Sequence, residues 1–240
     1  MKAISKLKTV LRVVREGGIP ALMKVMVYKL RVLRGPRLSV SSHVWSKAQD
    51  GELRYHLENA AQLATGFEQN NAVMLKGFGF GMADYVGKNV VDIGAGSRLR
   101  TRFFEGAHVF VIEPLAERYM NDVSGCDLCV ADRVYAVPAE EVVPELINIA
   151  DLVISINALD HCREFGQVIR NIALYAKSSA LIFLSFDGHE IANEMHPLVL
   201  NKNVCERAFR TAGLLVVRYQ EKEEYGSGVA LNWWLKKDSP

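Results

Sequence analysis

The residues from Asn89 to Pro114 read NVVDIGAGSRLRTRFFEGAHVFVIEP, and the expected fold follows from their pattern. The first five residues, NVVDI, are a β-branched run typical of a strand buried inside a parallel sheet. Glycines at positions 94 and 96 end this run, and a second apolar run, Val109 to Ile112, follows a short predicted helix. The stretch therefore predicts a strand, a glycine turn, a short helix and a second strand.

The two strand ends of this stretch together predict a nucleoside site. Gly94 and Gly96 let a ligand approach the main chain closely. Glu113 ends the second strand nineteen residues beyond Gly94, an offset at which an acidic side chain can bind both hydroxyls of a ribose. A dinucleotide fingerprint would need a third glycine where Leu99 stands, and the chain contains no P-loop. A nucleoside without a diphosphate is therefore favoured over NAD, FAD, ATP or GTP.

The blocks VVDIGAG and VFVIEPL resemble motifs I and II of the class I S-adenosylmethionine-dependent methyltransferases. The resemblance implies S-adenosylmethionine as the cofactor. It also implies that Asp92, Gly94 and Gly96 lie near the methionine part, and that Glu113, followed by Pro114, binds the ribose. The family often has another glycine two positions after Gly96, where this chain has an arginine. A glycine turn that binds nothing is the structural alternative.

Two later strand ends extend this resemblance. A short strand is predicted from Arg133 to Val137, and the turn after it in the family meets the adenine. The resemblance thus implies adenine contacts from Ala139 and Glu140, although a proline stands in place of the usual aspartate just before them. The run DLVISINALDH, residues 151–161, resembles the family pattern D-h-V-h-S-x-x-x-L-x-H, in which h is apolar. This match implies that Asn157 lies beside the cofactor.

The end of this fourth strand is also where the reaction is expected, because ligands of open α/β sheets bind beyond the carboxyl ends of the strands. Asp160 and His161 are candidate catalytic residues there. We favour His161 as the base for a hydroxyl acceptor, since neutral imidazole suits that role near pH 7. His189 follows the fifth predicted strand, Ala180 to Phe186, and is a third candidate. His161 could instead cap or orient the next helix, and a nitrogen acceptor would need no base.

Strands and helices alternate along the rest of the chain, as in a doubly wound sheet. Leu214 to Tyr219 and Val229 to Leu235 form a predicted closing hairpin, preceded by a helix that Asn201 caps. Together with the resemblance, this pattern predicts an α/β fold: a Rossmann-like doubly wound seven-stranded sheet with an antiparallel last strand, plus N-terminal helices. We expect residues 41–240 to form the methyltransferase domain and residues 1–40 to form separate basic amphipathic helices.

A helix is also predicted ahead of the first strand, in the run SSHVWSKAQDGELRYHLENAAQ, with Ser41 or Ser42 as its N-cap. In many small-molecule methyltransferases a helix in this place closes over the cofactor. The resemblance makes Trp45, Glu52 and His56 candidate pocket residues. Ordinary helix packing is the alternative for each of them.

The net charge of +2 is unevenly distributed along the chain. Residues 1–37 carry ten basic side chains and one acid, which gives this segment +9 and leaves −7 for the rest. Apolar residues recur in the segment at helical spacing, so two short amphipathic basic helices are predicted. Such helices either lie on an anionic membrane surface, bind a polyanion, or pack on the domain with a solvated charged face.

The cysteine pattern and the apolar runs indicate in which compartment the protein is expected and whether it binds a metal. The four cysteines include one C-x-x-C pair with no second pair and no histidine cluster nearby. We expect reduced thiols and no metal, in preference to the alternatives of a structural zinc site or a redox dithiol. No apolar run reaches the length of a membrane span, and the N-terminus lacks a clean apolar signal region. We therefore expect a cytoplasmic protein, peripheral on the inner face of the membrane if the basic segment binds lipid.

Together with these observations, the resemblance implies an S-adenosylmethionine-dependent methyltransferase. The expected acceptor is a small molecule or a glycan or other cell-envelope precursor, with O-methylation favoured. A non-catalytic, methyltransferase-like binding or interaction protein is the rival hypothesis. A nucleic-acid methyltransferase is disfavoured, because basic residues concentrate in the N-terminal segment and the tetrapeptide N/D-P-P-Y/F is absent after the fourth strand.

Overall fold

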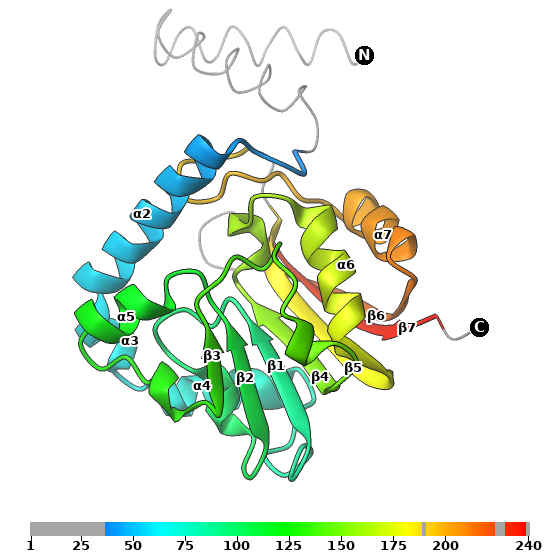
Figure 1. Cartoon of the computed structure of the whole chain (residues 1–240), viewed down its shortest axis with the longest axis horizontal. Coiled ribbons are helices and arrows are strands. Elements are labelled where there is room, and N and C mark those ends of the chain that lie inside the picture. The colour runs from blue at the N-terminus through cyan, green and yellow to red at the C-terminus, as the bar shows by residue number, and fades with distance from the viewer. Residues whose placement is uncertain (1–36, 189–190, 224–228, 239–240) are drawn as a thin grey trace, which may run out of the picture. The chain divides into compact units, whose positions relative to one another are not determined.

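The computed structural model of the chain describes residues 37–188, 191–223 and 229–238. Within these ranges one sheet contains seven strands: β1 (Asn89–Ile93), β2 (His108–Ile112), β3 (Arg133–Tyr135), β4 (Ala150–Ile156), β5 (Ala176–Gly188), β6 (Leu214–Glu223) and β7 (Val229–Lys237). Their order is β3-β2-β1-β4-β5-β7-β6 (Figure 1). Strands β1 to β5 pair in parallel, and β7 is antiparallel to both β5 and β6. The predicted seven-stranded sheet with an antiparallel last strand is confirmed.

Helices cover both faces of this sheet. Those in the described part of the chain are α2 (Ser42–Glu58), α3 (Ala60–Ala64), α4 (Phe67–Gly77), α5 (Ala116–Asp122), α6 (Phe165–Tyr175) and α7 (Lys202–Thr211). Helices α6 and α7 lie on one face of the sheet, and α4 lies on the other (Figure 1). Two 3-10 turns matter for the site: η1 (Arg100–Phe103) and η4 (Leu159–His161).

Alternate side chains of the strands fill two separate cores, because successive residues of a strand point to opposite faces. Val91 and Ile93 of β1 pack in the core with α6 and α7, whereas Val90 packs in the core with α4 and α5. Trp233 and Trp234 of β7 divide between the same two cores. Both faces of β1 are therefore buried. Polar side chains that follow the central strands lie instead beyond the strand ends, at the carboxyl edge of the sheet.

Two predicted helix caps are confirmed. Ser41 precedes α2, and its Oγ accepts a hydrogen bond of 3.4 Å from the amide of Val44. Asn201 precedes α7, and its Oδ1 accepts one of 3.1 Å from the amide of Val204. Both residues have extended backbone, which lets the side chain turn back onto the first helical turn.

Several elements differ from the predicted ones in their bounds or type, and β6 and β7 end later than predicted, at Glu223 and Lys237. Strand β3 ends at Tyr135 and not at Val137, because it is an edge strand and Pro138, which follows, has no N–H to donate. Strand β5 begins at Ala176 and not at Ala180, since Ala176 already pairs with the start of β4 across an irregular register. The predicted short helix after the glycine turn is the single 3-10 turn η1.

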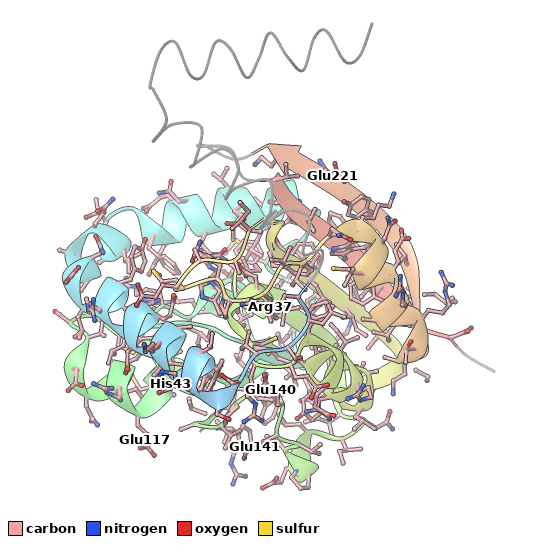
Figure 2. All side chains as sticks on the ribbon, turned by 90° about the horizontal axis from the view of Figure 1, so that it is seen from above. Arg37, His43, Glu117, Glu140, Glu141 and Glu221 are labelled. Atoms are coloured by element: carbon pink, nitrogen blue, oxygen red, sulfur yellow. The ribbon has the colours of Figure 1, made fainter. Side chains whose placement is uncertain are left out.

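Some predictions fall outside the described residues. The predicted basic helices occupy residues that are not described, and so does His189. The described chain begins at Arg37, which forms an antiparallel bridge with Val199, and Ser39 forms one with Glu164. This stretch leads into α2, where His43 lies in the first turn (Figure 2). None of the described helices has the length and apolar character needed to cross a membrane.

Candidate functional site

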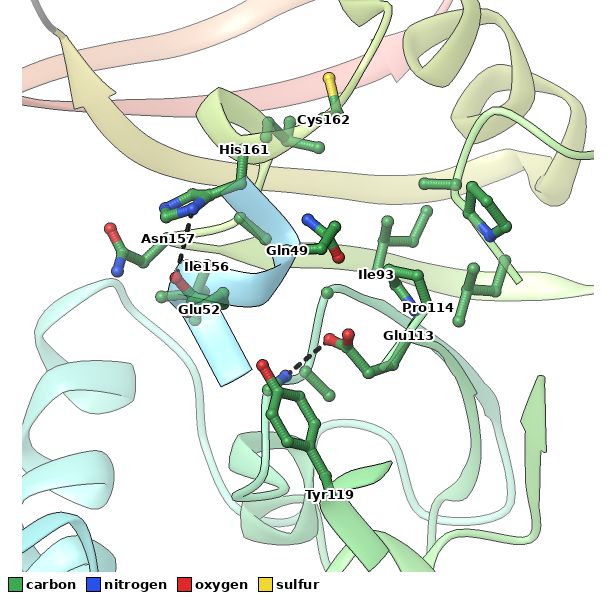
Figure 3. Close-up of a pocket in the computed structure, with 18 of the residues that line it drawn as sticks. Gln49, Glu52, Ile93, Glu113, Pro114, Tyr119, Ile156, Asn157, His161 and Cys162 are labelled. Atoms are coloured by element: carbon green, nitrogen blue, oxygen red, sulfur yellow. Dashed lines mark hydrogen bonds and ion pairs between the residues drawn. The ribbon is translucent and has the colours of Figure 1, made fainter. Parts of the chain in front are cut away.

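A cavity opens at the carboxyl ends of β1, β2 and β4 (Figure 3). Its floor comes from the glycine turn after β1 and from the residues that end β2 and β4. Helix α2 contributes the opposite wall. Of the predicted cofactor-binding residues, the cavity is lined by Gly94, Gly96, Glu113, Pro114, Ala139, Glu140 and Asn157. The structure thus brings together strand ends that are separated in the sequence.

The glycine turn has a conformation that residues with side chains rarely adopt. Gly94 and Gly96 have φ angles of 73° and 66°, in the left-handed region. A Cβ at position 94 would lie 2.2 Å from the Cβ of Ala158, and one at position 96 would lie 3.1 Å from Cε1 of His56. The turn therefore passes directly against the chain that follows β4 on one side and against α2 on the other.

Glu113 connects the end of β2 to this turn. Its Oε2 accepts a hydrogen bond of 3.0 Å from the amide of Gly96, and its Oε1 accepts one of 3.0 Å from the amide of Leu115. Burial raises the pKa of Glu113 to about 7, although both backbone hydrogen bonds favour the charged form. Each carboxylate oxygen still has a lone pair, so the side chain can accept two further hydrogen bonds.

Asp92 lies next to the turn but does not line the cavity. Its Oδ2 accepts a hydrogen bond of 2.8 Å from the hydroxyl of Thr101, and the side chain is buried. Burial raises the pKa of Asp92 to about 6, opposed by the Thr101 hydrogen bond and by the charge of Arg100. Arg100 itself lines the cavity. Asp92 therefore supports the turn from behind, and Arg100, the first residue of η1, is a charged side chain that lines the cavity.

The third strand end closes the cavity at the position that the resemblance assigns to adenine. Pro138, Ala139 and Glu140 all line it. Oε1 of Glu140 accepts hydrogen bonds from the amides of Arg163 and Glu164, at 2.5 and 2.8 Å. Because Glu164 is the N-cap of α6, Glu140 fastens the start of that helix to this wall of the cavity.

Helix α2 places polar side chains over the cavity, as the resemblance implied for a closing helix. Trp45, Glu52 and His56 all line it. Nδ1 of His56 lies 2.8 Å from Oγ of Ser97, and Nε2 lies 3.3 Å from Oε1 of Glu52. His56 therefore links α2 to the residue that follows the glycine turn.

Glu52 also reaches the end of β4. Its Oε2 lies 3.4 Å from Nδ1 of His161 (Figure 3). Burial alone would raise the pKa of Glu52, but the hydrogen bond from His56 and the charges of His161, His56 and His196 lower it. Glu52 is thus held as a carboxylate between two imidazoles.

The residues after β4 form the second half of the candidate site. Asn157 and His161 line the cavity, and Asp160 lies fully buried behind them. Asn157 has a φ of 56°, which is unusual for a residue with a side chain, and its amide donates to the carbonyl of Ser185 at 2.7 Å. This strained turn directs the chain from β4 into η4, and η4 carries Asp160 and His161.

Asp160 joins two histidines from different parts of the chain. Its Oδ2 lies 2.5 Å from Nδ1 of His196 and 3.8 Å from Nε2 of His161. Burial would lower the pKa of His196, but the hydrogen bond and charge of Asp160, with the charges of Asp187 and Glu52, raise it. Glu52, His161, Asp160 and His196 thus form a continuous row of alternating carboxylates and imidazoles.

Several residues of the cavity were not predicted from the sequence: Gln49, Tyr55, Arg100, Tyr119 and Cys162. Gln49 and Tyr55 share the α2 face that carries the predicted Glu52 and His56, so helical spacing from those residues was the available signal. The ring of Tyr119, in α5, lies 4.6 Å from that of His56 between centroids. No sequence pattern pairs these two residues.

No protein-family model matches the chain, and no curated protein sequence matches it. Solved structures do resemble it. One is the Burkholderia thailandensis 1,6-didemethyltoxoflavin-N1-methyltransferase with bound 1,6-didemethyltoxoflavin and S-adenosylhomocysteine. The alignment has a TM-score of 0.58 and 18% identity and covers 83% of this chain and 92% of that one. Another is a SAM-dependent methyltransferase of Leishmania major, at TM-score 0.57 and 16% identity, covering 80% of this chain and 83% of that one.

A third structure shares the fold under a different activity name. It is the [4+2]-cyclase SpnF, with a TM-score of 0.61, 12% identity and coverage of 86% of this chain and 99% of that one. At such identities the likeness establishes the fold. The chain has the class I S-adenosylmethionine-dependent methyltransferase fold, in agreement with its strand order.

Proposed function

We propose that this protein binds S-adenosylmethionine and transfers its methyl group to a small-molecule or glycan acceptor. The observation that carries the proposal is the position of Glu113, whose carboxylate lies in the cavity and is bonded to the backbone of Gly96. A carboxylate fixed in this way beside a glycine turn suits a ribose with two free hydroxyls. The same fold in a solved methyltransferase that holds S-adenosylhomocysteine supports the choice of nucleoside.

The residues of the cavity fit this cofactor. Glu113 would hold the ribose, and Ala139 with Glu140 would border the adenine. Gly94 and Gly96 bring the main chain to the nucleoside, while Arg100 provides a cation suited to the carboxylate of the methionine part. Asn157 would lie on the side of the reacting methyl group. When bound, S-adenosylmethionine supplies an electrophilic methyl carbon, and the protein mainly has to hold donor and acceptor in line.

We place the acceptor at the end of the cavity formed by Glu52, Asn157 and His161. A hydroxyl acceptor must lose its proton as its oxygen forms the bond to the methyl carbon and the sulfur keeps the electron pair. His161 can take that proton through a ring nitrogen, and the carboxylates of Glu52 and Asp160 lie 3.4 and 3.8 Å from its two ring nitrogens. His189, the third candidate, lies outside the described residues.

The second candidate function is non-methylating chemistry or simple binding on the same fold. The specific observation in its favour is the resemblance to a [4+2]-cyclase at a TM-score of 0.61. Such a protein would keep the Glu113 site and bind the nucleoside, but it would transfer no methyl group. Cofactor binding alone therefore cannot separate the two functions.

A labelled-methyl assay separates them. We expect the purified protein, with cell extract and S-adenosylmethionine carrying a labelled methyl group, to transfer label to an acceptor in the aqueous or the lipid fraction. His161→Gln should lower the rate by roughly 10² to 10⁴ if the acceptor is a hydroxyl and His161 is its base, with little change in cofactor affinity. If the protein binds the cofactor normally and transfers no more label than Glu113→Ala, the non-catalytic function is correct.

A further inference from the structure

Three potential metal ligands meet beside the cavity. Asp160, His161 and His196 each offer one donor atom, and these atoms lie within 4.8 Å of one another. We propose that these three residues bind one divalent transition-metal ion of the zinc type. From the sequence we expected no metal, because the one C-x-x-C pair has no second pair and no histidine cluster nearby.

Folding holds these segments together. Asp160 and His161 belong to η4, directly after β4, whereas His196 lies in the irregular chain between β5 and α7. The amide of Leu198 donates to the carbonyl of Asp160, at 3.4 Å, which ties that chain to η4. The imidazole rings of His161 and His196 are 4.3 Å apart between centroids. These contacts bring the three donor atoms together at one place, within 4.8 Å of one another.

The second observation that supports a metal site concerns the hydrogen bonding of the buried His161 ring. The residue is only 8% exposed, yet neither of its ring nitrogens makes a hydrogen bond with any described residue. Buried polar groups normally have partners, so a buried imidazole without one points to a ligand. Nε2 of His161 lies on the side of Asp160, at 3.8 Å from its Oδ2, where the proposed ion would be.

The other ring nitrogen of His161 faces a carboxylate. Nδ1 lies 3.4 Å from Oε2 of Glu52, an oxygen that also has no hydrogen bond within the described part of the chain. Metal-binding histidines usually donate their second N–H to a carboxylate or carbonyl, which fixes the ring and its tautomer. Glu52 is therefore a positioning residue, and the row Glu52, His161, ion, Asp160 follows the common carboxylate–histidine–metal arrangement.

The donor set selects the kind of metal. Two imidazoles and one carboxylate suit Zn²⁺, Fe²⁺ or Co²⁺, whereas Mg²⁺ and Ca²⁺ prefer all-oxygen sites. A His161 that coordinates through Nε2 and donates through Nδ1 has no nitrogen left for a substrate proton. Metal binding and the role of His161 as a base are therefore alternatives, and the metal content of the protein decides between them.

The test is zinc binding by the full chain after removal of metal with a chelator. Equilibrium dialysis and elemental analysis should find one Zn²⁺ per chain at this site, and Mg²⁺ should not compete. The background carries Cys126→Ser and Cys129→Ser, because the C-x-x-C pair could bind zinc independently. His196→Ala, at a side chain that is 19% exposed, should weaken binding by at least about 100-fold, and Glu52→Gln by about 10- to 100-fold.

His108→Ala is the matched control, because His108 also pairs with a carboxylate, that of Asp132 at 3.3 Å, but on the surface. It should leave zinc binding unchanged. Zinc affinity equal in His196→Ala and the background protein would overturn the proposal, as would the absence of zinc binding by folded protein. Binding of S-adenosylhomocysteine is measured on the same metal-free samples, so failure of the zinc site and failure of the cofactor site are recorded separately.

Discussion

Oε2 of Glu113 accepts a hydrogen bond from the amide of Gly96 at 3.0 Å, which joins the end of β2 to the turn after β1. The two residues that define the proposed nucleoside site are thus in direct contact with each other. Burial of the carboxylate raises its pKa to about 7, so near neutral pH it exists in both protonation states. This property makes the proposed ribose contact measurable.

The first prediction is that nucleoside binding releases protons. Ribose hydroxyls donate to the charged carboxylate and should lower the pKa of Glu113 from its value of about 7. We expect affinity for adenosine, which has no group that titrates near neutrality, to increase with pH from about 6 to about 8. Calorimetry at pH 7 in buffers of different ionisation enthalpy should show release of about half a proton. Binding without any dependence on the buffer would contradict the assigned role of Glu113.

Glu113→Gln is the control for this measurement. The amide side chain has a similar size and no charge, so it cannot release a proton on binding. We expect weaker adenosine binding with no dependence on pH in the same range. A variant that keeps the proton release would show that another group in the cavity releases the proton.

The second prediction concerns the close contact of Gly94 with Ala158. A Cβ at position 94 would lie 2.2 Å from that of Ala158, so Gly94→Ala should strongly destabilise the turn and abolish nucleoside binding. Gly87 is the matched control, because its φ is 67° and a Cβ there would meet no atom within 4 Å. Gly87→Ala should cost only the left-handed conformation, about 1–2 kcal/mol in the free energy of unfolding.

Urea denaturation of four chains checks this explanation: the wild type, Gly94→Ala, Ala158→Gly and the double variant. Ala158→Gly removes the atom that a Cβ at position 94 would strike. The double variant should therefore be more stable than the sum of the single changes predicts. Strict additivity would show that the contact is not the cause.

The third prediction is a stability difference that depends on pH. Burial raises the pKa of Asp92 from 3.8 to about 6, so ionisation of this carboxyl opposes folding. The protonated form of Asp92 stabilises the fold fully below the pKa of the unfolded chain. This stabilisation is lost as pH rises through the pKa of about 6 in the folded chain. Asp92→Asn keeps an acceptor for Thr101. Its free energy of unfolding, relative to that of the wild type, should increase by roughly 3 kcal/mol as pH increases across this window. Parallel unfolding curves at all pH values would contradict the buried state of Asp92.

Strand ends could be predicted from the sequence because local signals coincide there. The β-branched run before Gly94 and the acid at Glu113 both mark the end of a parallel strand, and the structure places both residues in one cavity. The helix cap at Asn201 could also be predicted, because its signal lies in neighbouring residues. Asp92 could not be assigned in this way, because its burial and its bond to Thr101 depend on how η1 packs behind the turn.

The row of carboxylates and imidazoles could not be predicted from the sequence, because its members meet only in the folded chain. Asp160 and His161 were predicted from a pattern after β4, but the partners Glu52 and His196 come from α2 and from the chain after β5. No spacing in the sequence relates α2 to η4, since they meet only when α2 covers the carboxyl edge of the sheet. The site was thus predicted as single residues, and its interactions came from tertiary structure.

The fourth prediction concerns the basic segment, residues 1–37, and it rests on the sequence. Residues 1–37 carry a charge of +9, and each basic side chain near an anionic surface contributes about 1 kcal/mol to binding. We expect the full chain to sediment with anionic but not neutral vesicles and to be released by salt. Changing Lys24, Lys29, Arg31 and Arg34 to Gln should abolish sedimentation. The same change at Arg207, Arg210, Lys236 and Lys237 should not, and an equal effect of both sets would contradict a specific role for the segment.

Calorimetric titration of the protein with S-adenosylhomocysteine, S-adenosylmethionine and NAD tests whether the cavity binds the proposed cofactor. We predict binding of both sulfur compounds at one per chain and much weaker binding of NAD, since the turn lacks the third glycine of a dinucleotide site. Glu113→Ala should weaken the binding of S-adenosylhomocysteine by roughly 100-fold through loss of two charge-assisted hydrogen bonds. NAD binding as tight as that of S-adenosylhomocysteine, or unchanged affinity in Glu113→Ala, would contradict the proposed nucleoside site.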